Sequence, residues 1–303
     1  MSKILYMFPG QGSQSVGMGR DLYEKYPAVR RMLDNFNSAL DFDLLKVMFE
    51  GPQEVLNDTQ YTQPALYSLS LAIYELLKEK GYSPDYLAGH SLGEYSAVAA
   101  SGALDYIEGL ELVARRGRLM AKASEKAPGL MAAVLFKNPE VEFPEVEKVV
   151  KELSAKGEIV IANYNGSFQV VISGEKELIK EAASLLAGRV KRVVPLSVSG
   201  AFHSPLMKPI AEEFAELLRK ATFRKPSIPV FMNVDASLAD APESIREKLL
   251  LQLTSPVRWT ELLKNAYIEG VREFVEVGPG RVLQGMVAKT LSGVVIKGYS
   301  SLL

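Results

Sequence analysis

Residues 88–95 read Ala88-Gly89-His90-Ser91-Leu92-Gly93-Glu94-Tyr95, and the rest of the chain is interpreted around them. They contain the pattern Gly-x-Ser-x-Gly with Ser91 at its centre. The segment 86–88 predicts the end of a short strand, and the Ala-rich segment 92–101 predicts a helix. A strand, a sharp turn and a helix are the setting of a nucleophile elbow, in which glycines leave room for neighbouring backbone. Ser91 would then lie at a helix N-terminus, where backbone N–H groups favour developing negative charge.

A plainer interpretation of Ser91 is helix capping. Ser91 and Glu94 have the spacing of a capping box, and a serine at the start of a helix is usually only a cap. The pattern Gly-x-Ser-x-Gly also arises by chance in unrelated chains. The pentapeptide by itself therefore leaves two alternatives, a nucleophile and a cap.

The composition indicates a globular protein, long enough for one large domain or two smaller ones. Of its 303 residues, 48% are hydrophobic and 23% are charged, which is ordinary for such proteins. The 35 basic and 36 acidic residues leave a formal net charge of -1, which gives no support for a nucleic-acid or membrane-surface partner. The N-terminal apolar run is too short for a signal peptide, and no segment is long enough to span a bilayer. We therefore expect a cytoplasmic protein, with a monomer as the default.

The scarcity of cysteine and histidine narrows the candidate chemistry. The chain has no cysteine, which excludes disulfides, cysteine nucleophiles and thiolate metal sites. Its two histidines are His90 and His203, so a serine that needs an imidazole base has two candidates. His90 adjoins Ser91, and at an elbow its side chain should point away from the serine. His203 is therefore the expected base.

A glycine-rich loop, residues 10–19, follows an expected buried strand at Lys3–Phe8. Glycines after a strand suggest dinucleotide binding, but Ser15 stands where the third glycine or alanine belongs, and no clear second strand with a terminal acidic residue follows at the usual distance. We therefore expect no dinucleotide site. The loop is either a flexible turn, or a turn whose backbone N–H groups face a site at the carboxyl end of the strand.

The chain as a whole alternates helices and strands, which predicts an α/β protein. Residues 129–197 show the order β-α-β-β-α-β, which is that of a small ferredoxin-like unit. Because further α/β alternation follows, we expect this unit to be an insertion. The host is expected to be an α/β-hydrolase-like domain with a parallel sheet, formed by residues 1–128 and 198–303. Its helices are expected at 20–37, 43–50, 62–80, 92–101, 105–126, 205–221, 242–253 and 259–268, with another after residues 278–280, and its strands at 3–8, 86–88, 229–233, 272–277 and 294–297.

Helical spacing places Arg116 on the buried face of the expected helix 105–126. Arg116 shares an apolar stripe with Leu112 and Leu119, whereas Arg115 lies on a charged, solvated stripe. A buried guanidinium is costly unless something pairs with it. The partner is either a carboxylate of the protein, in an internal salt bridge, or a carboxylate of a substrate, which arginine can bind through two hydrogen bonds.

Segments that run nearly from end to end of the chain resemble the malonyl-CoA:acyl carrier protein transacylases of fatty-acid synthesis. They are also similar to the acyltransferase domains of polyketide synthases. The elbow alone is a weak signal, but the Gly-Gln-Gly-Ser-Gln loop, Arg-Gly and Phe-His together are specific. The matching segments are Phe8-Pro9-Gly10-Gln11-Gly12-Ser13-Gln14, Gly89-His90-Ser91-Leu92-Gly93-Glu94-Tyr95, Arg116-Gly117, Met131-Ala132-Ala133, Gly200-Ala201-Phe202-His203 and Val277-Gly278-Pro279-Gly280.

The resemblance implies a division of labour among these residues. Ser91 would be the nucleophile, and His203 its general base and then the acid that protonates the departing CoA thiolate. The backbone N–H groups of Gln11 and Leu92 would form the oxyanion hole. In this family a backbone carbonyl orients the histidine, and the matching position is Gln252.

The resemblance also implies how the acyl group is selected. Arg116 would bind the free carboxylate of the malonyl group, and an acetyl group would leave that buried guanidinium unpaired. Asn163 and Met131 match family positions near the bound acyl group. Phe202, beside the histidine, accompanies malonyl rather than methylmalonyl in related domains, because the ring leaves less room for an α-methyl group.

The function implied is transfer of the malonyl group from malonyl-CoA to the phosphopantetheine thiol of acyl carrier protein. The route is ping-pong, through a malonyl-serine ester, and needs no metal or redox cofactor. A free-standing polyketide acyltransferase would look similar. A serine esterase or thioesterase would share the elbow but would not require Arg116, and would normally use an acidic triad partner, for which Asp235 is the nearest candidate. A catalytically idle carrier-docking module would not need Ser91, His203 and Arg116 together.

Overall fold

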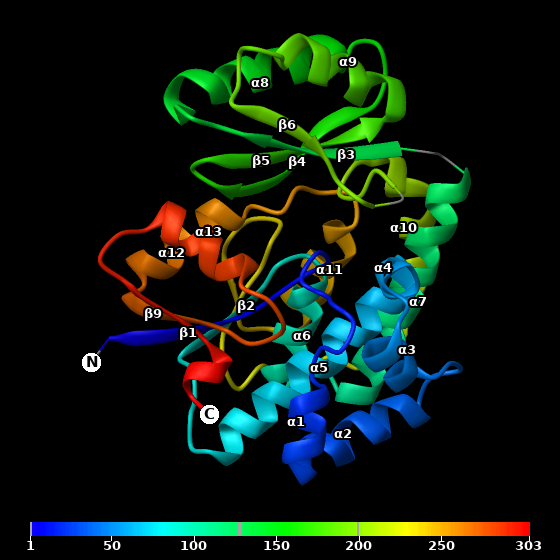
Figure 1. The fold of residues 1–303 in the computed structure, drawn as a ribbon, viewed down its shortest axis with the longest axis vertical. Coiled ribbons are helices and arrows are strands. Elements are labelled where there is room, and N and C mark those ends of the chain that lie inside the picture. Colours follow the sequence, from blue (N-terminus) through cyan, green and yellow to red (C-terminus); the bar gives the residue numbers. More distant parts are fainter. Residues whose placement is uncertain (1, 127–128, 199) are drawn as a thin grey trace.

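The computed structural model describes residues 2–126, 129–198 and 200–303. They form an α/β protein with two β-sheets, one above the other in Figure 1. The larger sheet has six strands, in the spatial order β10 (Val295–Gly298), β9 (Val271–Glu276), β1 (Lys3–Phe8), β2 (Tyr86–Gly89), β7 (Val230–Phe231) and β8 (Leu238–Ala239).

The first five of these strands run parallel, and β8 pairs antiparallel with β7. The expected parallel sheet is therefore present, with an antiparallel edge strand that makes it mixed. Two residues of β8 are too few to produce a periodic pattern, so the sequence contains no signal for it. Side chains of β1 alternate between two cores: Tyr6 and Phe8 pack on one face of the sheet, and Leu5 and Met7 on the other. A strand buried on both faces is typical of a parallel sheet.

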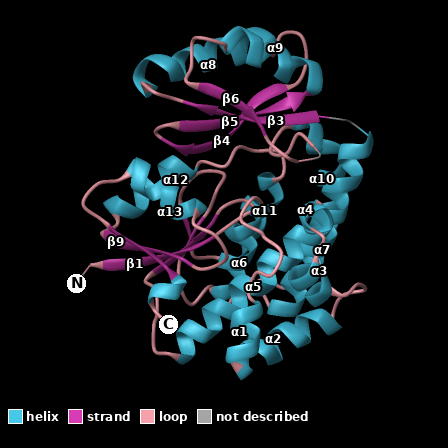
Figure 2. Cartoon of the chain, in the orientation of Figure 1, coloured by secondary structure: helices cyan, strands magenta, loops and turns pink. Residues whose placement is uncertain are grey.

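Helices pack on both faces of this sheet, as Figure 2 shows. The helix expected at 20–37 is divided at Tyr26, because Pro27 suits the first turn of a helix and not its interior. The short α4 was not expected. The helices are α1 (Arg20–Lys25), α2 (Pro27–Ser38), α3 (Leu44–Glu50), α4 (Gln53–Asn57), α5 (Thr59–Glu79), α6 (Leu92–Ala100), α7 (Tyr106–Lys126), α10 (Lys208–Lys220), α11 (Pro242–Gln252), α12 (Trp259–Ile268) and α13 (Val282–Thr290).

The longest helices are α5 and α7, with 21 residues each. The α5 helix begins three residues before its expected start, because the side chain of Asp58 accepts a hydrogen bond from Gln60 N at 3.1 Å and caps the first turn. Among the described residues, no helix is both long and apolar enough to cross a membrane.

The smaller sheet lies at the top of Figure 1 and has the order expected for the insertion. Its strands are antiparallel, and two helices cover its outer face. Their apolar side chains form a third, separate core with the sheet. In chain order the elements are β3 (Gly129–Leu135), α8 (Pro139–Leu153), β4 (Ile159–Gly166), β5 (Gln169–Glu175), α9 (Lys176–Leu186) and β6 (Arg192–Pro195). The expected stop of the preceding helix at Pro128 lies outside the described residues.

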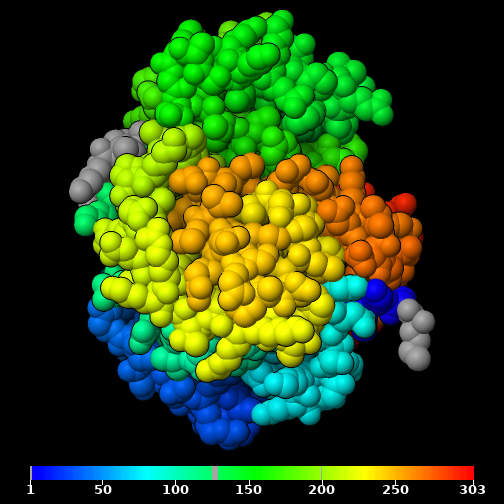
Figure 3. All heavy atoms as spheres, turned by 180° about the vertical axis from the view of Figure 1, so that it is seen from behind, coloured from blue at the N-terminus to red at the C-terminus, as the bar shows by residue number. Residues whose placement is uncertain are grey.

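The two sheets are joined by hydrogen bonds between β4 and the segment before α12. Tyr164 N donates to the carbonyl of Val257 at 2.9 Å, and Val257 N donates to that of Ala162 at 2.8 Å. Figure 3 shows the residues of the smaller sheet and its helices, in green, resting on this C-terminal segment, in orange. These bonds fix β4 at the carboxyl end of the larger parallel sheet, where α/β proteins bind their ligands.

Candidate active site

Ser91 lies in a sharp turn between β2 and α6. The strand ends at Gly89 and the helix begins at Leu92. Ser91 has φ 52° and ψ −106°, a conformation that a residue with a side chain adopts only when its surroundings impose it. A Cβ on Gly89 would lie 1.8 Å from the carbonyl oxygen of Gly93, and a Cβ on Gly93 would lie 2.0 Å from that of Phe8. The close packing of the turn therefore requires both glycines, as expected for a nucleophile elbow.

The capping interpretation of Ser91 is wrong. The Ser91 side chain makes no capping hydrogen bond to α6. The N–H of Ser91, which Glu94 would accept in a capping box, donates instead to Asn233 Oδ1 at 2.8 Å. Asn233 Nδ2 donates in turn to the carbonyl of Gly89 at 2.7 Å. Asn233, which follows β7 and is fully buried, therefore holds both sides of the turn.

Replacing Asn233 by alanine is expected to lower the free energy of unfolding by about 1–3 kcal/mol, because two buried backbone groups lose their partner. The reactivity of Ser91 should fall as well, since nothing then imposes its backbone conformation. Chemical denaturation measures the first effect, and labelling with a fluorophosphonate measures the second. Asn265→Ala, which removes one bond to the Ala236 carbonyl, is the matched control and should leave labelling unchanged. Wild-type labelling of Asn233→Ala would contradict this role.

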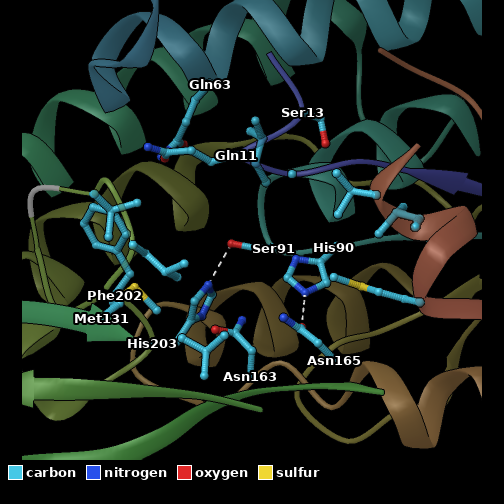
Figure 4. Close-up of a pocket in the computed structure, with 18 of the residues that line it drawn as sticks. Gln11, Ser13, Gln63, His90, Ser91, Met131, Asn163, Asn165, Phe202 and His203 are labelled. Carbon is cyan, nitrogen blue, oxygen red and sulfur yellow. Dashed lines mark hydrogen bonds between the residues drawn. The ribbon is translucent and has the colours of Figure 1, made fainter. Parts of the chain in front are cut away.

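His203 lies within hydrogen-bond distance of Ser91, as Figure 4 shows. The two atoms, His203 Nε2 and Ser91 Oγ, are 2.7 Å apart. On the other side of the ring, Nδ1 is 2.9 Å from the carbonyl oxygen of Gln252 and 3.2 Å from that of Ser255. Because carbonyl oxygens only accept, Nδ1 carries the proton, and Nε2 presents its lone pair to the serine hydroxyl. A hydroxyl so placed can lose its proton as it attacks an electrophile.

Burial keeps the imidazole of His203 neutral. The side chain is 4% exposed, and burial, together with the charge of Arg116, lowers its pKa to about 3, while the hydrogen bonds to Gln252 and Ser255 act in the opposite direction. A neutral imidazole is the form that a general base requires.

The other candidates for base and acid lie apart from this pair. His90 points away from Ser91, as expected, and its Nε2 is 2.7 Å from Asn165 Oδ1. The carboxylate of Asp235 forms an ion pair with Lys248 at 3.0 Å and is 45% exposed. Asp235 therefore does not serve as the third member of a triad.

Arg116 is buried beside Ser91, and no carboxylate of the described residues pairs with its charge. The residue is 1% exposed. Its Nη1 donates to Gln63 Oε1 at 2.8 Å, and its Nη2 donates to Gln252 Oε1 at 3.0 Å and to Ser91 Oγ at 3.3 Å. Within the described ranges Arg116 forms no ion pair, and its Nε has no hydrogen-bond partner. Of the two interpretations, the internal salt bridge is therefore wrong, and binding of a ligand's carboxylate remains.

One cavity of about 230 Å³ brings the expected site residues together. It lies between the carboxyl end of the larger sheet and the strands of the smaller one, as Figure 4 shows. Gln252 does not line the cavity. Its backbone carbonyl accepts a hydrogen bond from His203, and its side-chain oxygen accepts one from Arg116. The expected residues that line the cavity are Gln11, Ser91, Leu92, Arg116, Met131, Asn163, Phe202 and His203.

Several polar residues of the site were not expected from the sequence. Gln63 and Asn165 line the cavity beside Arg116 and His90, and Asn233 holds the elbow. Asn233 ends the strand expected at 229–233, but only the structure places that end beside the carboxyl end of β2. Gln63 carried no signal, because a glutamine near the start of a helix is common on any surface.

Comparison with known proteins agrees with this geometry. The sequence matches the acyl transferase domain family over residues 5–299. It is 43% identical over 291 residues to the malonyl CoA-acyl carrier protein transacylase of Bacillus subtilis, which covers 95% of this chain and 90% of that protein.

Two solved structures share the fold. The acyl carrier protein S-malonyltransferase of Vibrio cholerae has a TM-score of 0.91 at 38% identity, covering 98% of this chain and 96% of that chain. A malonyl-transacylase in complex with a type II polyketide synthase acyl carrier protein has a TM-score of 0.92 at 38% identity, covering 98% of this chain and 95% of that chain. The α/β architecture described above is therefore also that of solved malonyl-transferring enzymes.

Proposed function

We propose that this chain, which belongs to the acyl transferase family, transfers the malonyl group from malonyl-CoA to the phosphopantetheine thiol of acyl carrier protein. The observation that carries the proposal is the position of Ser91 between two other groups. Its Oγ is 2.7 Å from Nε2 of the base His203 and 3.3 Å from Nη2 of Arg116, which forms no ion pair among the described residues. A nucleophile, its base and a carboxylate-binding group in one cavity fit an acyl donor that carries a free carboxylate.

In the first half-reaction, His203 Nε2 takes the proton of Ser91 Oγ as this oxygen attacks the thioester carbonyl carbon. The tetrahedral intermediate collapses with cleavage of the C–S bond. The CoA thiolate leaves with the proton from His203, and the malonyl group remains on Ser91 as an ester. Arg116 holds the malonyl carboxylate throughout, so the acyl group stays oriented between the two half-reactions.

The backbone N–H groups of Gln11 and Leu92 stabilise the oxyanion in this scheme. Leu92 is the first residue of α6, where N–H groups point out of the helix towards developing charge. The loop that contains Gln11 packs against the elbow, since His90 N donates to the carbonyl of Phe8 at 3.0 Å. A Cβ on Gly10 would lie 2.5 Å from the carbonyl oxygen of His90. These contacts support a shared hole formed by the two backbones.

In the second half-reaction the carrier thiol replaces CoA and the steps reverse. His203 takes the proton of the phosphopantetheine thiol, the thiolate attacks the ester carbonyl, and Ser91 Oγ leaves with the proton. No metal or redox cofactor enters this scheme, and the absence of a cofactor requirement stays a prediction. We also propose that the malonyl-acyl carrier protein formed in this way is used in fatty-acid synthesis. A polyketide pathway is the alternative, because one structural relative is bound to a polyketide carrier protein.

The cavity lining supports selection of malonyl over related acyl groups. Arg116 favours an acyl group with a carboxylate, because any other leaves the guanidinium unpaired. Phe202 limits the room for an α-methyl group, and its carbonyl is held by Ser173 Oγ at 2.7 Å. Asn163 and Met131 line the same cavity from β4 and β3 and form the wall on the side of the smaller sheet.

The finer description of the fold belongs to the same proposal. We regard residues 1–128 and 198–303 as an α/β-hydrolase-like catalytic domain, and residues 129–197 as an inserted ferredoxin-like subdomain. The strand order β4-β5-β3-β6 supports the second part, and the elbow after β2 supports the first. The cytoplasmic location and the monomeric state stay predictions.

The rate at which malonyl-CoA acylates Ser91 is expected to change by less than about twofold between about pH 5 and about pH 7. The pKa of His203 is lowered to about 3, so the base stays neutral throughout this window and is lost only as the pH falls further. A base with an ordinary histidine pKa would lose more than about tenfold over the same interval. Stopped-flow acylation at each pH tests this, and a midpoint near that of an exposed histidine would contradict it.

Competition between water and the carrier thiol tests the proposed function against a thioesterase. Protein carrying labelled malonyl on Ser91 is divided between buffer and holo-acyl carrier protein, and loss of label is followed in both. We expect the carrier to remove the label much faster than water does. Equal rates would contradict the transfer reaction and favour hydrolysis. Parallel assays with fatty-acid and polyketide carrier proteins distinguish the two pathways.

A further inference from the structure

Glu94 is a buried carboxylate that the proposed mechanism does not use. It lies in the first turn of α6 and is 0% exposed. One oxygen accepts the backbone N–H of Asn233, and the other accepts Nε2 of Gln252. Glu94 forms no ion pair within the part of the chain that the structure describes. Such a carboxylate is expensive to bury, so its contacts call for an explanation.

Its contacts are those of an ionised group. Burial raises the pKa of Glu94, and the hydrogen bonds from Asn233 and Gln252 and the charge of Arg116 oppose this rise. Each carboxylate oxygen faces an N–H donor, so a proton on either oxygen would meet another donor in place of an acceptor. The geometry therefore favours the ionised form of Glu94 over the protonated form. Its negative charge lies on the side of the Gln252 amide that faces away from Arg116.

The side chain of Gln252 stands between this carboxylate and Arg116. Its Nε2 donates to Glu94 and, at 2.8 Å, to the carbonyl of Ser91. Its Oε1 accepts Nη2 of Arg116 at 3.0 Å. Rotating the amide by half a turn would set its oxygen against the two acceptors and its NH2 group against the guanidinium. Glu94 and the Ser91 carbonyl therefore determine which end of the amide Arg116 meets.

The amide also separates two opposite charges. A carboxylate in direct contact with Arg116 would form a bidentate pair and occupy the donors that a ligand needs. Through the amide, the negative charge acts on Arg116 without occupying its donors. Burial lowers the pKa of Arg116, and the neighbouring Tyr95 and Glu94 side chains oppose this effect. Arg116 stays in place, and its Nε stays unpaired among the described residues.

We propose that Glu94 is a positioning residue, which through the Gln252 amide holds Arg116 ready for the carboxylate of the acyl group without pairing with it. The inference rests on the proposed function, because it concerns the choice between malonyl and uncharged acyl groups. Glu94 itself touches no substrate, and its effect reaches the reaction only through Gln252 and Arg116.

The test is the ratio of two rate constants for acylation of Ser91, one with malonyl-CoA and one with acetyl-CoA, each followed by intact-protein mass. In Glu94→Gln the Gln252 amide loses the charge that orients it, and its NH2 group can turn towards the guanidinium. We expect the malonyl-to-acetyl ratio to fall about ten- to one-hundredfold. A loosened structure would slow both donors alike. An unchanged ratio would therefore overturn the proposal, whatever happens to the absolute rates.

The exchanged pair Glu94→Gln with Gln252→Glu separates position from charge. It keeps one buried carboxylate and a hydrogen-bonded path from Asn233 N to Arg116, loses the bond to the Ser91 carbonyl, and sets the carboxylate directly against Arg116. We expect the low ratio to persist, because the guanidinium is then paired internally. Return of the wild-type ratio would mean that any buried negative charge suffices, and would overturn the proposal.

Glu142→Gln is the matched control. Glu142 is also a buried carboxylate that accepts backbone N–H groups, from Lys137, Asn138 and Lys191, but it lies in α8, on the outer face of the smaller sheet. The Glu142→Gln variant should lose stability and keep the wild-type ratio of malonyl to acetyl acylation.

If Glu94→Gln does not fold, Glu94→Asp is the second variant. It keeps the charge but places the carboxylate farther from Gln252, so it is also expected to lower the ratio. Failure of the wild-type protein to become malonylated would contradict the proposed function, whereas normal malonylation with an unchanged ratio in the variants would contradict only this inference.

Discussion

Replacing Ser91 by alanine is expected to abolish the acyl-enzyme and to lower malonyl transfer about a million-fold, the cost of removing the nucleophile from a serine enzyme. Among the described residues, Ser91 Oγ is the hydroxyl that hydrogen-bonds to the base His203, so we expect no other hydroxyl to take its place. The assay is transfer of labelled malonyl from malonyl-CoA to holo-acyl carrier protein. Intact-protein mass should show no adduct in the variant.

His203→Ala is the companion to this experiment. Because the serine and its base act as one unit, its loss should approach that of Ser91→Ala, and the double variant should be little worse than either. Asp235→Asn is the control, since Asp235 pairs with Lys248 and does not touch the imidazole, and it should retain wild-type transfer. Transfer that survives in Ser91→Ala would mean direct attack of the carrier thiol on malonyl-CoA, and would contradict the ester intermediate.

Replacing Arg116 by alanine is expected to lower malonyl transfer about a thousandfold, because the malonyl carboxylate is then left without a partner in a buried site. Transfer of acetyl should stay the same or rise, since no guanidinium is left unpaired. The measurement is kcat/KM for malonyl-CoA and acetyl-CoA in the wild-type protein and in the variant. Their ratio reports the contribution of Arg116 to selectivity.

Two further variants sharpen this prediction. Arg116→Lys keeps the charge but loses the second hydrogen bond, so it should fall between the wild-type protein and Arg116→Ala. Arg115→Ala removes a neighbouring arginine that is exposed on the other stripe of α7, and should change neither rate. If Arg116→Ala keeps the full preference for malonyl, the carboxylate of the acyl group is bound elsewhere.

Local patterns in the sequence predicted the residues that carry the chemistry. The spacing of Gly89 and Gly93 around Ser91 is a local steric requirement, so five residues were enough to suggest the elbow, although a helix cap stayed the alternative. The helical stripe that contains Arg116 predicted its burial, and the scarcity of histidine singled out His203. Each of these signals depends on short-range geometry or on composition, both of which a single sequence contains.

The residues that hold these groups in place were much less predictable. Asn233 is 142 positions from Ser91, and only the parallel pairing of β2 with β7 brings the two together. Gln252 was expected to act through its backbone carbonyl, and its side-chain contacts with Arg116 and Glu94 depend on where the last residue of α11 lies relative to α7 and α6. Such long-range contacts leave no periodic pattern in the chain, and the Ser-x-x-Glu spacing of Glu94 even suggested a different role.

The intact mass of the protein after incubation with malonyl-CoA, before and after addition of holo-acyl carrier protein, tests the central claim most directly. The account predicts a gain of one malonyl group, located on Ser91 by peptide mapping, and its quantitative return to the unmodified mass when the carrier is added, with malonyl appearing on the carrier. An unmodified protein that nevertheless malonylates the carrier, or an adduct on Ser91 that the carrier does not remove, would contradict it.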